Sequence, residues 1–299
     1  MSTPKSNHFV SRSYLARFSD REGFLHVFDR YSRSFRRQRP KEVMAINHYY
    51  RQEWAPSGGD PNIMEKGLGE WLERDVKKSI DRLIHEPATL TEQEMATLLT
   101  YLELQRIRVP RQFDMAKTLM QETLMRDMPS EAAALIRAGR ASLTIEDSAR
   151  FEYIRALVGK LSPWFGVMKW EICQAEEGAS FVTTDSPLSL YNPATPPPAE
   201  PGLALAGTIV LFPLDSHHML FLRHSEYLTR SDMSPLAVLP EPSVKDGWIS
   251  IASGRVWNTD KVNTFNWQML QLCDRFVVAE SREVLEACIS YDNRWLYSA

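Results

Sequence analysis

The strongest constraint on the fold is that one long helical region separates two β-rich regions. From residue 63 to about residue 175, apolar side chains recur at helix spacing, beginning with Met64 and Leu68. Short β-rich runs lie before this region, within residues 24–39, and after it, within residues 180–223. Because a two-stranded hairpin is marginally stable alone, the early strands are expected to pair with the late ones.

We therefore predict an α+β protein, with a mixed or antiparallel sheet built from the N- and C-terminal segments and an inserted helical subdomain. The predicted division is an N-terminal segment with a β-hairpin (1–60), a helical subdomain (61–176) and an α+β C-terminal part (177–299). The first and third parts are expected to form one compact unit. Five prolines within residues 192–202 predict a surface loop or a lid.

Composition and absent motifs exclude several classes of protein. The 299 residues carry a formal net charge of −3, so any nucleic-acid role must depend on a local basic patch. Three widely spaced cysteines predict no disulfide framework and fit a reducing compartment. We find no secretory signal and no apolar run near the roughly 18 residues of a membrane span, so we expect a cytoplasmic protein with no membrane partner. The motifs of serine hydrolases, P-loop NTPases, dinucleotide-binding enzymes and zinc proteases are missing.

Two residues could supply acid–base chemistry. His8 precedes the run Tyr14–Phe18, and histidine titrates near neutral pH. Asp185 follows an apolar strand, at a position where catalytic carboxylates are common. Simpler interpretations stay open: His8 would hydrogen-bond locally near the terminus, and Asp185 would close an Asx-turn.

Gln105 and Arg108 share one face of the second long helix because they are spaced i, i+3. The surrounding residues are apolar, so this end of the helix is expected to be well packed. A partly buried arginine needs a carboxylate or an anionic ligand. Glu65 and Glu73 on the preceding helix are candidate partners, and structural ion pairing is the default interpretation.

A basic run in the N-terminal hairpin resembles a nucleic-acid contact, because arginines bind phosphates and aromatic rings stack on bases. A solvated hairpin edge protected by charge gives the same pattern, and we favour that edge. The predicted nucleic-acid contacts are Arg30, Arg33, Arg36, Arg37 and Arg39.

A metal site is not established by the sequence. Asp215, His217, His218 and His224 are close in sequence, but adjacent strand residues point to opposite faces. Zinc sites need three or four ligands in fixed geometry, and no such spacing is present. The metal stays unknown, although a divalent ion is compatible with the chemistry considered below.

The ordered set of these motifs resembles a bacterial family known as domain of unknown function 4238 (DUF4238), along nearly the whole chain. The first segment resembles the family's His-Tyr-Val-Pro-Gln opening, with Ser11 where the family often has proline. The resemblance also covers Glu65 and Glu73, Gln105 with Arg108 and Pro110, Phe181 with Thr183, Asp185 and Pro187, Phe212-Pro213-Leu214, and Asn266 with Arg275 and Phe276. The family name implies no reaction, but it nominates these polar residues as a converging set.

Two hypotheses from different classes follow. In the first, the protein is a hydrolase of an anionic substrate, specifically a nuclease-like phosphodiesterase. Its catalytic residues would be His8, Glu73 and Asp185, and its substrate-binding residues Gln105, Arg108 and Asn266. In the second, the same residues form a buried structural network within a non-catalytic binding module.

Overall fold

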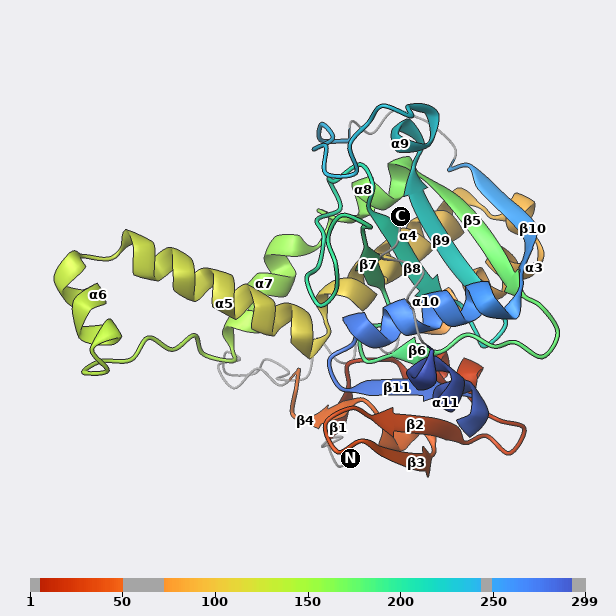
Figure 1. Cartoon of the computed structure of the whole chain (residues 1–299), viewed down its shortest axis with the longest axis horizontal. Helices are drawn as coiled ribbons and strands as arrows, with labels where there is room; N and C mark the ends of the chain where they lie inside the picture. The colour runs from red at the N-terminus through yellow and green to blue at the C-terminus, as the bar shows by residue number, and fades with distance from the viewer. Residues whose placement is uncertain (1–5, 51–72, 243–248, 292–299) are drawn as a thin grey trace, which may run out of the picture.

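A computed structural model describes residues 6–50, 73–242 and 249–291 (Figure 1). Within these residues lies a five-stranded sheet of order β10-β5-β9-β8-β7. β10 pairs parallel with β5, and the other neighbours pair antiparallel. Its strands are β5 (Met168–Ala175), β7 (Ser189–Tyr191), β8 (Ile209–Pro213), β9 (His218–His224) and β10 (Ile251–Trp257).

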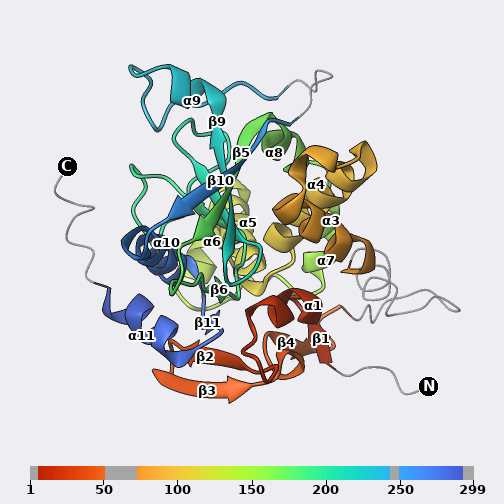
Figure 2. The same cartoon turned by 90° about the vertical axis from the view of Figure 1, so that its right-hand side faces the viewer.

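This sheet is covered on both faces, because its central strands are apolar at successive positions. Val210 and Phe212 of β8 join one hydrophobic cluster with the helices α3 and α4, whereas Leu211 between them joins a second cluster with α10. In β9, Leu220 and Phe221 divide in the same way. Figure 2 shows α3 and α4 on one side of the sheet and α10 on the other.

A four-stranded antiparallel sheet of order β3-β2-β11-β6 joins the two ends of the chain. Its strands are β2 (Leu25–Asp29), β3 (Ser34–Gln38), β6 (Thr183–Thr184) and β11 (Phe276–Ala279). The prediction of an α+β fold with a sheet built from N- and C-terminal segments is therefore confirmed. The late strands do not all join this sheet, since β8 and β9 belong to the larger one. The division at residues 60 and 176 stays a prediction.

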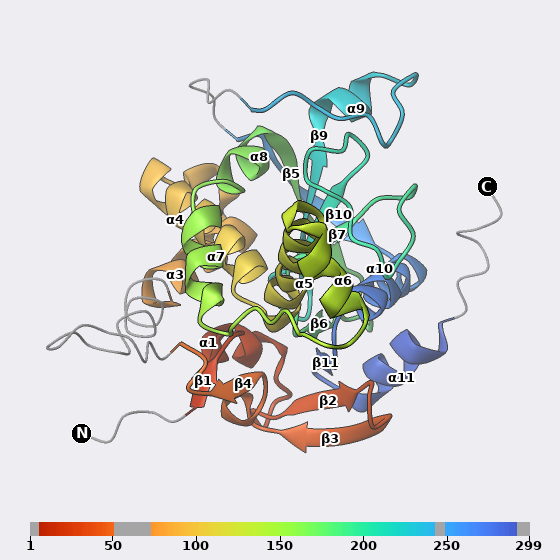
Figure 3. The same cartoon turned by 90° about the vertical axis from the view of Figure 1, so that its left-hand side faces the viewer.

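The helices of the middle region lie between the strands of the two ends, as the periodicity predicted. The prediction of helix up to about residue 175 was wrong at its end, because Met168–Ala175 form β5 of the larger sheet, with buried residues at successive positions. α4 begins at a capping box, in which the Thr91 side chain accepts from the Glu94 N–H and the Glu94 carboxylate accepts from the Thr91 N–H. The helices are α1 (Arg12–Leu15), α3 (Glu73–His85), α4 (Glu92–Ile107), α5 (Pro110–Asp127), α6 (Ser130–Arg137), α7 (Ala149–Leu157), α8 (Ser162–Val167), α9 (Ser225–Thr229), α10 (Thr259–Leu272) and α11 (Arg282–Ser290). α5 and α6 project from the body as an arm (Figures 1 and 3). In the described part of the chain, no helix is long and apolar enough to cross a membrane.

The N-terminal segment packs where the two larger sheets meet. β1 (Ser6–His8) pairs antiparallel with β4 (Ala45–Asn47), and α1 lies beside them (Figures 2 and 3). The buried Tyr14 hydroxyl of α1 lies 2.8 Å from Thr183 Oγ1 and 2.8 Å from the carbonyl oxygen of Pro213. Tyr14 thereby contacts β6 of one sheet and β8 of the other, which fixes α1 and the adjoining β1.

Candidate functional site

His8 ends β1 with an incompletely bonded ring. The side chain is partly buried, and its Nε2 has no hydrogen-bond partner. Burial is the main cause that lowers the pKa of His8, and the positive charge of Arg12 acts in the same direction. Main-chain hydrogen bonds with Lys41 and Pro40 act in the opposite direction. With a lowered pKa, His8 is mainly neutral at neutral pH and can offer a ring nitrogen as a base.

Gln105 and Arg108, at the C-terminal end of α4, are buried with polar atoms that have no partner. Both side chains are almost fully enclosed, with exposed fractions of 0% and 1%. Among the described residues, two guanidinium nitrogens of Arg108, Nε and Nη2, and both amide atoms of Gln105 have no hydrogen-bond partner. The predicted ion pair between Arg108 and a carboxylate is not found among the described residues. A buried guanidinium without a carboxylate is costly, which favours an anion as the missing partner.

His8 and Arg108 are linked by charge. The charge of Arg108 contributes to the lowered pKa of His8, so the two side chains interact electrostatically. The Tyr49 hydroxyl donates to the main-chain carbonyl of Arg108 at 3.2 Å, which holds the end of α4 against the segment that follows β4. We call His8, Gln105 and Arg108 the inner pocket, a name for the set of residues with these unpaired polar atoms and not for a measured cavity.

A basic hollow adjoins the inner pocket on the His8 side. It has a volume of about 420 Å³ and is lined by Arg12, Ser13, Arg39, Pro40 and Lys41. Three of these five residues lie beside His8, since Arg12 acts on its pKa by charge and Pro40 and Lys41 by main-chain hydrogen bonds. The hollow therefore lies beside His8.

Asp185 occupies a different place and is fully bonded. Its Oδ1 accepts from the N–H of Asp274 at 3.0 Å, and its Oδ2 accepts from those of Arg275 and Phe276 at 2.6 and 2.8 Å. Burial raises the pKa of Asp185 to about 6, although the three N–H donors oppose this effect. This carboxylate anchors the start of β11 to the end of β6, a long-range contact in place of the local Asx-turn considered above.

Asn266 of α10 is likewise engaged with main chain. Its Oδ1 accepts from the Val182 N–H at 3.0 Å, and its Nδ2 donates to the Ser180 carbonyl at 2.9 Å. The amide supplies to residues 180–182 the pairing that a neighbouring strand would supply. Among the described residues, no hydrogen bond or ion pair joins Asp185 or Asn266 to His8 or Arg108. Their catalytic and substrate-binding roles stay predictions, and their contacts are those of structural anchors.

The side chains of the two glutamates predicted on the first long helix are not among the described parts of the structure. Glu65 lies outside the described residues, and of Glu73 only the backbone, at the first residue of α3, is described. A glutamate that the sequence analysis missed, Glu103 on α4, is 1% exposed. Its carboxylate accepts from the N–H groups of Gly159 and Leu161 at 2.9 and 2.6 Å and anchors the start of α8.

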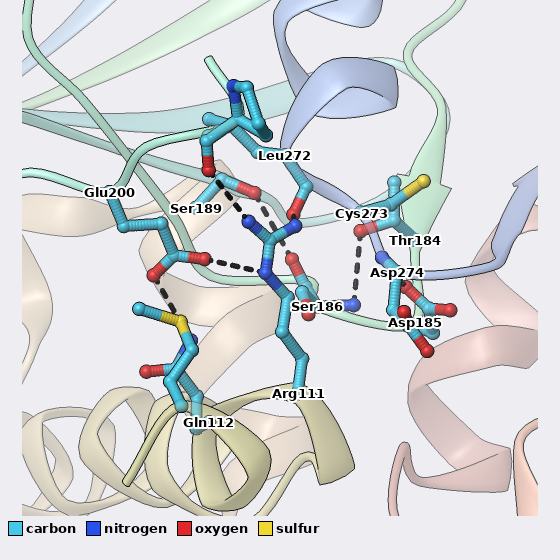
Figure 4. Close-up of polar contacts among 12 residues, drawn as sticks. Arg111, Gln112, Thr184, Asp185, Ser186, Ser189, Glu200, Leu272, Cys273 and Asp274 are labelled. Carbon is cyan, nitrogen blue, oxygen red and sulfur yellow. Dashed lines mark hydrogen bonds and ion pairs between the residues drawn. The ribbon is translucent and has the colours of Figure 1, made fainter. Parts of the chain in front are cut away.

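A second missed carboxylate, Glu200, holds the proline-rich loop to α5. Its side chain is 2% exposed and pairs with Arg106 and with Arg111 Nε, the latter at 2.9 Å. Gln112 Nε2 donates to Glu200 at 3.0 Å, and the Arg111 guanidinium also donates to the Leu272 carbonyl (Figure 4). The sequence contains a weak signal for this contact, namely an acidic residue in a proline-rich loop and two arginines around the end of the second long helix. This cluster is internally paired and needs no ligand.

Most arginines of the basic run in the N-terminal hairpin form hydrogen bonds or ion pairs within the protein. Arg30 donates to the Cys273 carbonyl at 2.7 Å, and Arg36 pairs with Asp29 at 3.0 Å. Arg37 pairs with Asp20 and Glu22. Arg33 is exposed, and Arg39 lines the basic hollow. Of the five predicted nucleic-acid contacts, Arg39 therefore borders a concave surface.

The histidine-rich turn also forms internal contacts. His218 Nδ1 lies 2.9 Å from Asp215 Oδ1, whose carboxylate also accepts from the N–H groups of His217 and His218. His224 Nε2 lies 2.7 Å from the Leu203 carbonyl. In residues 6–50, 73–242 and 249–291, no three His, Cys, Asp or Glu side chains are grouped as metal ligands.

The fold and these contacts define a class of α+β protein that has internally bonded polar anchors and, apart from them, a buried arginine and glutamine without partners among the described residues. The chain matches, over residues 6–283, the family described as "Protein of unknown function (DUF4238)", and it belongs to this family. No curated protein and no solved structure matches it. The family assignment confirms the resemblance seen in the sequence and supplies no reaction.

Proposed function

We propose that this protein binds a phosphate-bearing anion in the inner pocket and hydrolyses a phosphodiester there. The observation that carries the proposal is the buried Arg108, whose Nε and Nη2 have no partner among the residues that the structure describes. A planar guanidinium with two free donors is complementary to two phosphate oxygens. The unpaired amide of Gln105, one helical turn away, supplies a further donor and an acceptor.

His8 would act as the base of this reaction. In its neutral form it takes a proton from water, the water oxygen attacks phosphorus, and the ester oxygen leaves with its bond to phosphorus broken. Arg108 stabilises the charge that develops on the phosphate oxygens. A divalent ion stays compatible with this proposal. The leaving oxygen takes its proton from the protonated His8 or from solvent, so every proton in the reaction is accounted for.

We also retain the non-catalytic alternative, a binding module with a structural polar network. The bonding of Asp185 and Asn266 to main chain favours it for that part of the molecule. It predicts that Arg108 is needed for stability in the absence of any ligand.

Replacing Arg108 by methionine distinguishes the hydrolase proposal from the non-catalytic alternative. If the guanidinium is an unpaired buried charge, Arg108→Met leaves the free energy of unfolding unchanged or raises it by about 1–3 kcal/mol, and abolishes phosphate binding. If Arg108 belongs to a satisfied network, the same change costs about 3–5 kcal/mol. Urea denaturation measures stability, and phosphorus NMR with inorganic phosphate measures binding.

Activity is tested on the full chain with a chromogenic phosphodiester, with and without Mg²⁺ or Mn²⁺. We expect His8→Gln to lower kcat by about 10²–10⁴-fold. The exposed histidine of α3 provides a matched control, because His85→Gln makes the same change away from the pocket. Equal rates for the wild type and His8→Gln under all metal conditions would refute the catalytic part of the proposal.

We further propose a bacterial protein that works in the cytoplasm. All three cysteines, Cys173, Cys273 and Cys288, are free and buried. Burial raises the pKa of the Cys173 and Cys288 thiols to about 12, so they stay protonated and unreactive. A chain with no disulfide supports the choice of a reducing compartment.

A further inference from the structure

The basic hollow is a concave surface held between two short segments of the N-terminal region. Its volume of about 420 Å³ lies within the range of roughly 300–1,000 Å³ that small-ligand sites occupy. Two of its lining residues, Arg12 and Ser13, open α1, which follows β1, and the others, residues 39–41, precede β4. Because β1 pairs with β4 and the Phe9 N–H donates to the Met44 carbonyl at 3.1 Å, the two segments are held together before any ligand binds.

The hollow gathers positive charge that the protein does not neutralise. Three of its five lining residues are the exposed cations Arg12, Arg39 and Lys41, and none is acidic. In the part of the chain that the structure describes, no ion pair involves any of these three cations. The carboxylate of Glu42, the next residue along the chain, accepts from the Arg39 N–H at 3.0 Å. A concave surface with uncompensated charge of one sign attracts ions of the other sign.

Arg37 and Arg39 show that the missing pairing is a property of the hollow. Both guanidinium groups lie over the Phe24 ring, at 4.3 and 4.4 Å from its centroid. Arg37 pairs with Asp20 and Glu22, whereas the charge of Arg39 has no such partner among the described residues. The ring contact restricts the Arg39 side chain, which therefore loses less freedom when it binds an anion.

The amount of charge in the hollow favours a diphosphate group as the ligand. A single phosphate ester carries about −1.5 to −2 at neutral pH, which leaves part of the charge of three cations unmatched. A nucleic-acid strand carries one negative charge for each nucleotide, so a hollow lined by five residues would meet about one or two charges. Two linked phosphates with one free end carry about −3 on adjacent groups, which matches the three cations.

We propose that the basic hollow binds a diphosphate group, carried by inorganic pyrophosphate or by a nucleoside diphosphate. The restrained guanidinium of Arg39 binds oxygens of one phosphate in its planar fork, and Arg12 and Lys41 neutralise the other. This inference does not depend on the proposed function, because the lining residues of the hollow do not include His8, Gln105 or Arg108.

The test is calorimetric titration of the full chain, without divalent ions, with pyrophosphate, ADP, inorganic phosphate and a short thymidine oligonucleotide. We expect the wild type to bind pyrophosphate at least about 10-fold more tightly than phosphate. The hollow variant Arg12→Gln, Arg39→Gln, Lys41→Gln should raise the pyrophosphate Kd by about 10–100-fold, since each exposed charge contact contributes a few-fold.

Two further variants control this measurement. Arg21→Gln, Arg137→Gln, Arg140→Gln removes the same charge from exposed positions outside the hollow, and its pyrophosphate Kd should stay within about 2-fold of wild type. The double variant Arg12→Gln, Lys41→Gln keeps Arg39 on the Phe24 ring and should raise the Kd by about 5–25-fold. It replaces the triple variant if loss of the ring contact impairs folding.

The outcomes either support or overturn the inference. Equal pyrophosphate Kd values in the hollow variant and the charge control overturn it, as does pyrophosphate binding that is lost in Arg108→Met and kept in the hollow variant. Binding of phosphate as tight as that of pyrophosphate, or binding of the oligonucleotide that is tighter and is lost in the hollow variant, overturns the diphosphate class. Where pyrophosphate binding depends on the hollow, a tighter ADP assigns a nucleoside diphosphate, and an equal or weaker ADP assigns the diphosphate group alone.

Discussion

Replacement of Asp185 by alanine tests whether this carboxylate is a structural anchor. The change removes the acceptor of three buried main-chain N–H groups, at 3.0, 2.6 and 2.8 Å. Hydrogen bonds to a charged group contribute about 1.5–3 kcal/mol each, or about 5–9 kcal/mol for three. Burial of the carboxylate offsets part of this, because its pKa is raised from 3.8 to about 6. At about 1.4 kcal/mol for each pKa unit, this net shift disfavours the ionised form by about 3 kcal/mol at neutral pH; it already includes the three hydrogen bonds, so the burial cost offsets much of their contribution.

We therefore expect Asp185→Ala to lower the free energy of unfolding by about 2–6 kcal/mol at pH 7. The sign of the pH dependence follows from the raised pKa of Asp185. The folded protein holds this proton more tightly than the unfolded chain, so its stabilising effect is complete below about pH 4 and is lost as pH rises through about 6. The difference between wild type and variant should be about 1–1.5 kcal/mol larger at pH 5 than at pH 8.

Urea denaturation at several pH values measures this difference, because titrating groups common to both proteins cancel. Asp127→Ala is the control, since Asp127 is exposed and pairs with its neighbour Arg126 alone. The control should stay within about 0.5 kcal/mol of wild type. A loss below about 1 kcal/mol for Asp185→Ala, or a loss that grows towards alkaline pH, would refute the anchor role and revive a catalytic role.

Three further changes probe the other anchors by the same measurement. Asn266→Leu leaves two buried main-chain groups unpaired and should cost about 2–4 kcal/mol; a cost within 0.5 kcal/mol, roughly the scatter of surface changes, would contradict it. Glu200→Gln should cost about 3–5 kcal/mol, because it leaves Arg106 and Arg111 as buried charges. The pKa of Glu200 is lowered, so its contribution is present above the ordinary glutamate pKa and is lost in acid, and the variant should lose less stability on acidification than wild type. Glu103→Ala should cost about 2–4 kcal/mol and increase hydrogen exchange at residues 159–162, whereas unchanged exchange there would argue against an anchor.

Much of the fold could be predicted because each region has its own hydrophobic period. The structure has helices within residues 73–157 and the strand β2 within residues 24–39, and β2 pairs with the late strand β11. The error was to place all late strands in one sheet. β8 reads Ile-Val-Leu-Phe-Pro, apolar at successive positions, which indicates a strand covered on both faces rather than one bordering solvent. That pattern could have separated the second sheet.

The candidate site was harder to predict, because a sequence gives residue types and not their partners. Asp185 and Arg108 both read as polar residues among apolar neighbours. Asp185 meets three N–H groups some 90 positions away, a contact that depends on the register of β6 against β11. Arg108 meets no acceptor for two of its nitrogens, which depends on all the elements that enclose it. Neither outcome is encoded in local spacing.

The bonding of the buried polar groups is what distinguishes the two hypotheses. A satisfied carboxylate such as Asp185 stabilises the free protein and has no oxygen left for a substrate. An unsatisfied guanidinium such as Arg108 lowers the stability of the free protein and gains its partner when an anion binds. The two residues should therefore respond in opposite ways, with loss of stability in Asp185→Ala, and loss of binding without loss of stability in Arg108→Met. A protein that lost stability in both variants would have a structural network throughout, and the inner pocket would then hold no ligand.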